Sequence, residues 1–231
     1  MTSNRFFIDQ SPLSTSSSSV FLYGDEHHHL SRVARINPRD KVWLFDAQGT
    51  SYLARVEEIN QEKTRLFILK KKEKEKPKAN ITLDQALIRK KKMEAIIQKA
   101  TEWGISTFIP VITSRTVVDI KDKIEKRMVR WRRIAREAAK QSRQALLPRI
   151  LLPMDLGRLI KNRKEEKKFL LSESRGNYLK DILLSSSARN AMPSSVIVLV
   201  GPEGEWSEEE EENILSQHYE AVSLGRQVLW P

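Results

Sequence analysis

The sequence contains no cysteine among its 231 residues. Without thiols the chain can form no disulfide, no thiolate zinc site and no cysteine nucleophile. No apolar run approaches the roughly 18 residues of a membrane-spanning helix, so no membrane partner is expected. The start, Met1 to Phe7, lacks a basic stretch followed by a long apolar one, so no secretory signal is predicted. These absences favour a cytoplasmic protein.

Basic residues exceed acidic ones, with 41 Lys and Arg against 30 Asp and Glu and a net charge of +11. The stretch Lys121–Lys168 holds 17 basic and 6 acidic residues, so its surplus equals the net charge of the whole chain. Clustering of this kind is typical of proteins that bind nucleic-acid phosphates. A solvated helix face is the alternative interpretation, and it holds for most charge runs.

The first part of the chain is predicted to form a small β-barrel. Short apolar runs of strand length recur there with little helical periodicity: Val42–Phe45, Tyr52–Ile59 and Thr64–Leu69. The polar segment Lys70–Lys78 contains Pro77 and breaks this pattern. We therefore expect a barrel domain over residues 1–72, a charged linker over 73–79 and a second domain over 80–231.

In the second domain strands alternate with helices. Strands are expected at Ile81–Leu87, Ile105–Thr113, Phe169–Leu171 and Val196–Val200, and helices at Met93–Trp103 and Ile124–Ala138. The unbroken β-branched run at Val196–Val200 suits a strand that is covered on both faces, as in a parallel sheet with flanking helices. The fold class is therefore α/β. Trp43, Trp103 and Trp131 are interpreted as core residues.

A ligand site is expected where the last of these strands ends, because open α/β sheets bind ligands beyond the carboxyl ends of their strands. The strand is followed by Gly201-Pro202-Glu203-Gly204 and by a helix start at Ser207 with Glu210, which form a capping box. Glutamates 208 to 212 would repel an anion, so a neutral or cationic small ligand fits this loop better than a phosphate. A tight structural turn is the alternative.

Several motifs, in order along the chain, resemble those of one family. They are Arg5-Phe6-Phe7, a segment with His29, Leu30, Arg35 and Asp40 that is similar to HLxxVLRxxxGD, Met93–Gly104 with its QKATEWG ending, Val200–Gly204 against a GPEGG loop, and Leu224-Gly225 against LGxRILRxETA. Over nearly its full length the chain resembles the SPOUT-class uridine N3-methyltransferases of small-subunit ribosomal RNA, the RsmE family.

The resemblance implies a PUA-like barrel that binds RNA and a SPOUT domain with a trefoil knot that holds S-adenosylmethionine. The implied reaction is methylation of N3 of a uridine in 16S ribosomal RNA by a homodimer without a metal, with the assembled small subunit as the substrate. The cofactor-binding residues it implies are Leu171, Ser172, Glu173, Val200, Gly201, Pro202, Glu203, Gly204, Leu224, Gly225, Val228 and Leu229.

Glu203 is the one ionisable side chain within the Gly201–Gly204 loop, so it is the candidate for the catalytic base or for a group that orients the uracil. Its alternative role is to tie down the loop. The candidates for RNA contact are Arg5, Arg115, Arg130, Arg133, Arg136 and Arg143. His27, His28 and His29 are expected on a strand, where neighbours point to opposite faces and cannot converge on one metal ion.

The chain also departs from the family pattern. Glu205 stands where the second glycine of GPEGG is expected, Gln227 and Trp230 stand where arginines are expected, and the sequence ends at Pro231 without the ETA segment. Two alternatives to the proposed reaction therefore stay open. One is an RNA-binding protein with a degraded cofactor site and an incomplete knot, and the other is a SPOUT methyltransferase that acts on another RNA position.

Overall fold

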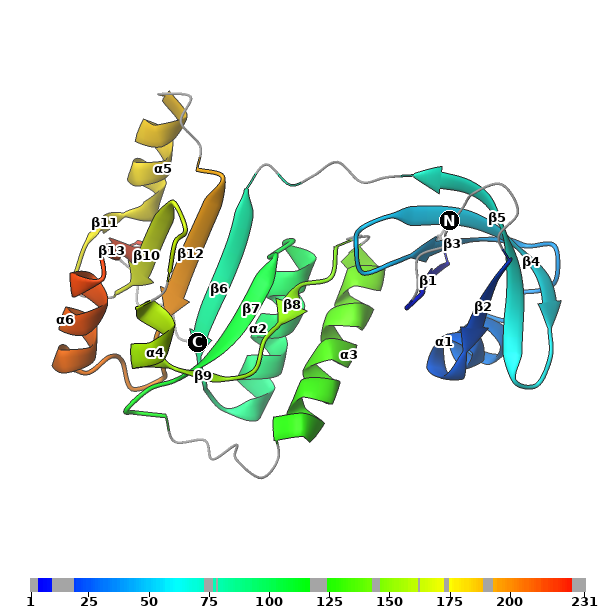
Figure 1. The fold of residues 1–231 in the computed structure, drawn as a ribbon, viewed down its shortest axis with the longest axis horizontal. Helices are drawn as coiled ribbons and strands as arrows, with labels where there is room; N and C mark the ends of the chain where they lie inside the picture. Colours follow the sequence, from blue (N-terminus) through cyan, green and yellow to red (C-terminus); the bar gives the residue numbers. More distant parts are fainter. Residues whose placement is uncertain are drawn as a thin grey trace. The chain divides into compact units, whose positions relative to one another are not determined.

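The structure is a computed structural model, and it describes residues 4–9, 19–72, 77, 79–116, 124–142, 146–161, 163–172, 175–188 and 193–225. The chain forms two compact units (Figure 1). The first contains Met1–Lys76 together with Arg136–Leu147, and the second contains Pro77–Ala135 and Pro148–Pro231. The last part of the helix Ile124–Ser142 thus belongs to the first unit, although Pro77–Ala135 separates it from that unit's N-terminal segment.

The first unit is built on a five-stranded sheet of order β1-β3-β4-β5-β2. Its strands are β1 (Arg5–Phe7), β2 (Ser19–Tyr23), β3 (Lys41–Phe45), β4 (Ser51–Ile59) and β5 (Lys63–Lys72). The three predicted strands are confirmed. The expected break at Lys70 is wrong, because Lys70, Lys71 and Lys72 continue the antiparallel ladder against β4. Closure of this sheet into a barrel stays a prediction.

A helical segment, not a strand, carries the three histidines. α1 spans Gly24–His28 and continues into a π-helical turn at His29–Val33, so the expectation of a strand there is wrong. Asp25 and Glu26 lie in the first turn of α1, where negative charge is favoured by the helix dipole. Within the described residues no group of three or more metal-ligating side chains is found.

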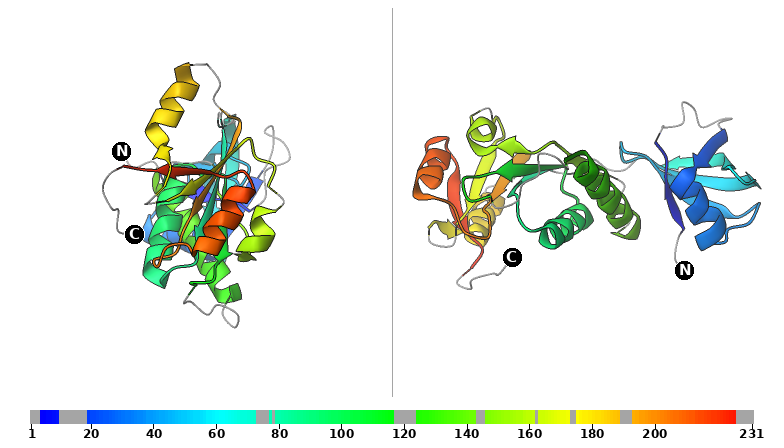
Figure 2. Two further views of the ribbon diagram at one scale, coloured as in Figure 1. Left: turned by 90° about the vertical axis from the view of Figure 1, so that its left-hand side faces the viewer. Right: turned by 90° about the horizontal axis from the view of Figure 1, so that it is seen from below.

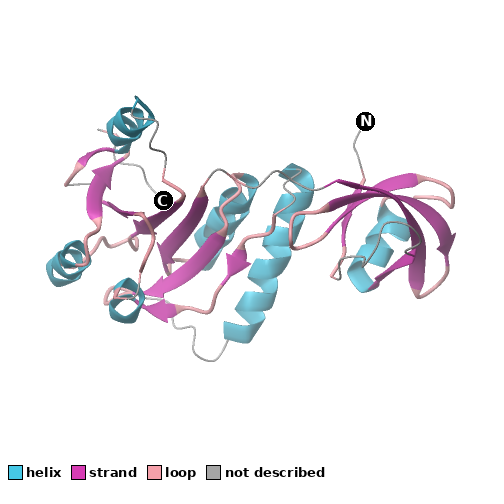
Figure 3. Ribbon diagram, turned by 45° about the horizontal axis from the view of Figure 1, so that its top comes forward, coloured by secondary structure: helices cyan, strands magenta, loops and turns pink. Residues whose placement is uncertain are grey.

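The second unit contains a sheet, whose strands are magenta in Figure 3, of order β11-β13-β10-β12-β6-β7-β8, with β9 also paired to β7. The strands are β6 (Asn80–Ala86), β7 (Thr107–Ile112), β8 (Arg149–Ile150), β9 (Met154–Asp155), β10 (Lys167–Leu171), β11 (Asn177–Tyr178), β12 (Ser195–Val200) and β13 (Glu220–Ser223). Every pair in it is parallel. The predicted α/β class with a parallel sheet is therefore confirmed, whereas the knot stays a prediction.

Helices cover both faces of this sheet (Figure 2). They are α2 (Lys90–Glu102), α3 (Ile124–Ser142), α4 (Leu156–Ile160), α5 (Leu179–Ala188) and α6 (Glu208–Ser216). Phe108 packs in a core with α2 and α3, and its neighbour Ile109 packs in another core with α4 and α6. Successive strand residues point to opposite faces, so β7 is buried on both sides. No described helix is long and apolar enough to cross a membrane.

Of the three tryptophans predicted to lie in the core, Trp131 is 2% exposed but Trp103 is 81% exposed. Trp43 is half-buried. At 100° per residue Trp103 lies roughly 100° from the centre of the buried stripe of α2, and it forms the C-cap of that helix. The expectation that Trp103 is a core residue is therefore wrong.

Two residues other than glycine adopt left-handed backbone conformations at positions where the family motifs carry glycine. Arg39, which precedes Asp40, has φ of 80°, and Glu205 has φ of 60°. A side chain with a Cβ atom is disfavoured in this region by roughly 1–2 kcal/mol. The motif glycines thus correspond to a backbone requirement, and this chain meets the requirement with strained residues.

Candidate functional site

β13, β10, β12, β6 and β7 are parallel neighbours in that order (Figure 1). The loops that follow these strands therefore lie together at the carboxyl-terminal end of the second unit's sheet, which we call the loop edge. The register pairs Leu171 with Val222 and Val200 with Gln85. The structure thereby brings together most of the predicted cofactor residues, namely Leu171, Ser172, Val200, Gly201, Pro202, Glu203, Gly204, Leu224 and Gly225. Glu173, Val228 and Leu229 lie outside the described residues.

The start of the Gly201–Gly204 loop is held against β6. Gln85, which is 2% exposed, donates from Nε2 to the carbonyl oxygen of Gly201 at 3.3 Å. A Cβ atom on Gly201 would lie 3.0 Å from Nε1 of Trp206, so glycine at this position lets the indole ring approach the loop without a shift. Nε1 of Trp206 is buried and has no hydrogen-bond partner among the described residues. A buried donor in this position is available to a ligand acceptor.

The second half of the loop is held by the segment after β7. Arg115 donates from Nη1 to the carbonyl oxygen of Gly204 at 2.5 Å. The backbone N–H of Ser114 donates to Oε1 of Glu210 at 2.7 Å, while Oε2 of Glu210 accepts from the N–H of Ser207 at 3.2 Å. The predicted capping box is therefore confirmed. Its carboxylate also joins two loops, which the sequence pattern alone did not indicate.

Glu203 lies between two cations that are not among the predicted site residues. Its Oε1 lies 2.9 Å from Nζ of Lys92, and its Oε2 lies 3.7 Å from Nε of Arg89. Both come from the start of α2, where residues 89 to 92 are four consecutive Arg and Lys residues. This basic run was the signal in the sequence that could have indicated cations beside the Gly201–Gly204 loop. Among the described residues, the Glu203 carboxylate is thus held by side chains rather than by backbone amides.

The remaining cofactor segments adjoin this loop through α6 and β13. Ser172 donates from Oγ to Oε1 of Glu211 at 3.2 Å, and its N–H donates to the carbonyl of Val222 at 3.0 Å. Ser223 donates from Oγ to the carbonyl of Gly225 at 2.9 Å. Leu224 is 57% exposed. An exposed apolar side chain at this edge is suited to contact a ligand.

The arginines predicted to contact RNA are divided between the two units. Arg5 is half-buried, and its guanidinium lies over the Phe45 ring at 5.1 Å. Arg130 binds both carboxylate oxygens of Glu94, at 2.5 and 2.7 Å, and thereby holds the pKa of Glu94 below its usual range.

Arg136 lies over the ring of Phe7 at 4.3 Å and 3.6 Å from Asp9, whereas Arg133 is exposed and has no ion pair within the described residues. Arg143 lies outside the described residues. RNA contact by these arginines stays a prediction.

A buried ion pair lies in the middle of β6. Asp84 is 0% exposed, and both of its oxygens accept from Nη2 of Arg163 at 2.6 Å. Burial raises the pKa of Asp84 to about 6, although Arg163 opposes the shift. Burial also raises the pKa of the nearby Tyr219 hydroxyl. This pair fastens the segment before β10 to the sheet and is part of the core rather than of the loop edge.

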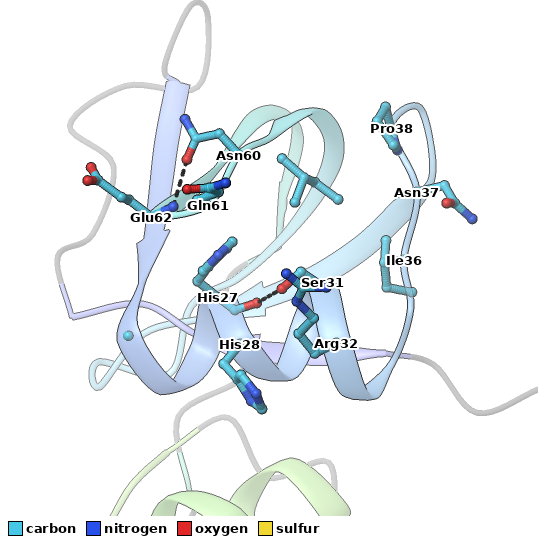
Figure 4. A pocket seen from close by; sticks show the side chains of 12 residues that line it. His27, His28, Ser31, Arg32, Ile36, Asn37, Pro38, Asn60, Gln61 and Glu62 are labelled. Carbon is cyan, nitrogen blue, oxygen red and sulfur yellow. Dashed lines mark hydrogen bonds between the residues drawn. The ribbon is translucent and has the colours of Figure 1, made fainter.

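The first unit has a hollow of about 830 Å³ between the α1 segment and the turn that joins β4 to β5 (Figure 4). His27, Ser31 and Asn60 are among the residues that line it. His27 is fixed by a 2.8 Å hydrogen bond between its Nδ1 and Oγ1 of Thr64, and Oγ of Ser31 donates to the His27 carbonyl at 2.8 Å. A smaller hollow of about 320 Å³ shares Asn60 with it.

Two family models match the chain. A model described as an RNA methyltransferase domain matches residues 74–230, and one described as an RNA methyltransferase PUA domain matches residues 22–69. The ribosomal RNA small subunit methyltransferase E of Bacillus subtilis is 28% identical, and the match covers 97% of this chain and 90% of that protein. The Aquifex aeolicus protein of the same name is 31% identical, with 84% and 80% covered.

A solved structure supports the same relationship. The ribosomal RNA small subunit methyltransferase E of Neisseria gonorrhoeae, bound to S-adenosyl methionine, has a TM-score of 0.86 and 30% identity. The match covers 98% of this chain and 91% of that one. Both units therefore have counterparts in a solved structure.

Proposed function

Since the chain belongs to the family of the ribosomal RNA small subunit methyltransferase E proteins, we propose that it methylates N3 of a uridine in 16S ribosomal RNA with S-adenosylmethionine as the methyl donor. The observation that carries this proposal is the joining of the three loops after β10, β12 and β13 at one edge of a parallel sheet. Ligands of open α/β sheets bind at such an edge.

The residues at this edge fit S-adenosylmethionine. Gly201 leaves no Cβ atom beside the indole of Trp206, and the buried Nε1 of Trp206 offers a donor. The first turn of α6 carries four glutamates, Glu208 to Glu211, which suit a sulfonium cation and would repel a phosphate. Leu171, Ser172, Val200, Pro202, Leu224 and Gly225 complete the set that we assign to cofactor binding.

When bound, S-adenosylmethionine supplies an electrophilic methyl group. The imide nitrogen of uridine becomes nucleophilic when its N3 proton leaves, so a group of the chain has to accept that proton as N3 takes the methyl group. We assign that role to Glu203, whose carboxylate is held in place by Lys92 and Arg89. Arg115 fixes the carbonyl of Gly204 and thereby the orientation of the loop, and orientation supplies much of the acceleration in a direct displacement.

The site is proposed to work as part of a homodimer whose partner completes it, on the assembled small subunit in the cytoplasm. A trefoil knot in the second unit, which the family resemblance implies, is part of the same proposal. Light scattering tests the dimer, since a monomer mass at every concentration would contradict it.

The reaction is tested with purified protein, small ribosomal subunits that lack the modification, and donor labelled in the methyl group. After digestion the label is expected in N3-methyluridine. Glu203→Gln should lower the rate by about 10²- to 10⁴-fold, the usual contribution of a positioned acid–base group. Glu205→Gln is the matched control, because Glu205 makes no ion pair within the described residues.

The two alternative functions give other results. Label in a ribose 2′-O-methyl nucleoside or in transfer RNA would identify another methyltransferase specificity. Binding of the subunit without any label, together with no calorimetric heat at millimolar S-adenosylmethionine, would identify an RNA-binding protein with a degraded site.

A further inference from the structure

The solvent face of the first unit's sheet carries aromatic side chains where polar ones are expected. Phe21 is 39% exposed and Tyr23 is 59% exposed, and both lie on β2, which is the last strand of the sheet. Antiparallel pairing places Phe21 opposite Arg65 and Tyr23 opposite Lys63 on the neighbouring strand β5. Directly paired residues of antiparallel strands lie on the same face. Aromatic and cationic side chains therefore alternate on one surface.

The cations are held against the aromatic rings. Nζ of Lys63 lies 4.9 Å from the centre of the Phe21 ring, and the guanidinium of Arg55 lies 5.7 Å from the centre of the Phe67 ring. Phe67 is paired with Arg55 across β4 and β5, so it extends the same face. We call this set of six residues the aromatic face: Phe21, Tyr23, Arg55, Lys63, Arg65 and Phe67.

The aromatic face has a positive surplus. Its three cations are accompanied by two carboxylates: Glu57, which lies 2.8 Å from Arg65 and 3.6 Å from Arg55, and Glu58, which is paired with Arg65 across β4 and β5. Lys63 has no ion pair among the residues that the structure describes. Its ammonium group is thus available to a phosphate directly beside an exposed ring.

A hollow of about 320 Å³ opens on this face between Phe21, Lys63, Arg65, Glu58 and Asn60. Oδ1 of Asn60 accepts from the backbone N–H groups of Glu62 and Lys63 at 3.0 and 2.9 Å. This leaves the Asn60 amide nitrogen as a donor without a partner within the described part of the chain. The hollow therefore combines an aromatic wall, cations and a fixed amide, and it adjoins the larger hollow through Asn60.

We propose that the aromatic face binds a single-stranded segment of the RNA substrate, with bases stacked on Phe21 and Tyr23 and phosphates at Lys63 and Arg65. Bases of single strands stack on aromatic side chains while cations follow the backbone. The positive surplus selects this occupant over a second copy of the basic chain, which it would repel. The inference rests on the proposed function only in that the substrate is RNA.

The test measures binding of the full chain to a fluorescently labelled single-stranded RNA 12-mer by anisotropy, without any methyl donor. Tyr23→Ala and Phe21→Ala are each expected to weaken binding about 5- to 150-fold, which corresponds to a stacking contribution of roughly 1–3 kcal/mol per base. Tyr23→Trp should restore the affinity. Lys63→Gln should lower the slope of log K against log salt by about 0.7, as for one lost phosphate contact on a single strand.

Trp103→Ala is the matched control, since it removes an exposed aromatic from the second unit and should leave the affinity unchanged. Unchanged binding by Phe21→Ala and Tyr23→Ala, or an equal loss in Trp103→Ala, would overturn the proposal. A change of sedimentation mass in the aromatic variants would overturn it in favour of a self-interface. Because the assay contains no donor, an inactive enzyme that still binds through this face would refute the proposed function alone.

Discussion

Replacing Glu205 with glycine should stabilise the second unit. Glu205 has φ of 60°, and its side chain is exposed, with no ion pair within the described residues. A residue with a Cβ atom loses roughly 1–2 kcal/mol in this left-handed conformation. Glycine avoids that loss but adds about 0.5–1 kcal/mol of conformational entropy to the unfolded chain. The difference is a net gain of about 0.5–1 kcal/mol in the free energy of unfolding.

The assay is thermal and urea unfolding of the wild type, Glu205→Gly and Glu205→Ala. For a chain of this size 1 kcal/mol corresponds to about 2–4 °C in the melting temperature, so the glycine variant should melt about 1–4 °C higher. The alanine variant keeps the Cβ atom and should gain nothing. Equal stabilisation by alanine and glycine would refute the reasoning, because it would place the effect in the charge of Glu205 rather than in the backbone.

Three further changes test other parts of the structure. Burial raises the pKa of Asp84 to about 6 from 3.8, so the folded state holds this proton more tightly, and the stability gained below pH 3.8 is lost as the pH rises through 6. In pH-dependent urea unfolding, the stability of the wild type relative to Asp84→Asn should fall by about 2 kcal/mol between pH 4 and 6; a flat difference would contradict the shift. Lys140→Met should cost about 3–5 kcal/mol in urea unfolding, because it leaves the Glu26 carboxylate, 2.5 Å away, buried without its cation; a loss below 1 kcal/mol would contradict this. Gly176→Ala should fail to give soluble protein or should melt at a much lower temperature, because its Cβ atom would overlap the carbonyl of Ala221 and φ is 97°; a normal melting curve would contradict the contact.

The parallel sheet and its capped helix could be predicted from the sequence because the signals there are local. Val196–Val200 is a run of β-branched and aliphatic residues that forms β12, and Ser207 with Glu210 forms the capping box. The same local logic failed at the histidines. Adjacent polar residues carry no periodicity that separates a strand from a short helix, so the sequence predicts a strand at His27 and His28, where the structure has a helix.

The contacts that shape the candidate site could not be predicted, because they join distant residues. Gln85 reaches Gly201 across 116 positions, and Arg115 reaches Gly204 across 89. No pattern in either segment indicates its partner. The basic run at the start of α2 could have indicated that a cation such as Lys92 takes part in the site. Its pairing with Glu203, however, depends on the order of the strands in the sheet.

The position of β12 between β10 and β6 also bears on how the protein folds during synthesis. β6 pairs with β7 soon after both leave the ribosome, but its other edge pairs only with β12. At about 5–20 residues per second, that edge stays open for several seconds to about twenty seconds. An open apolar strand edge is prone to wrong pairing. The loop that follows β12 is therefore completed late, and folding of the candidate site should depend on chaperones or on rapid translation more than folding of the first unit does.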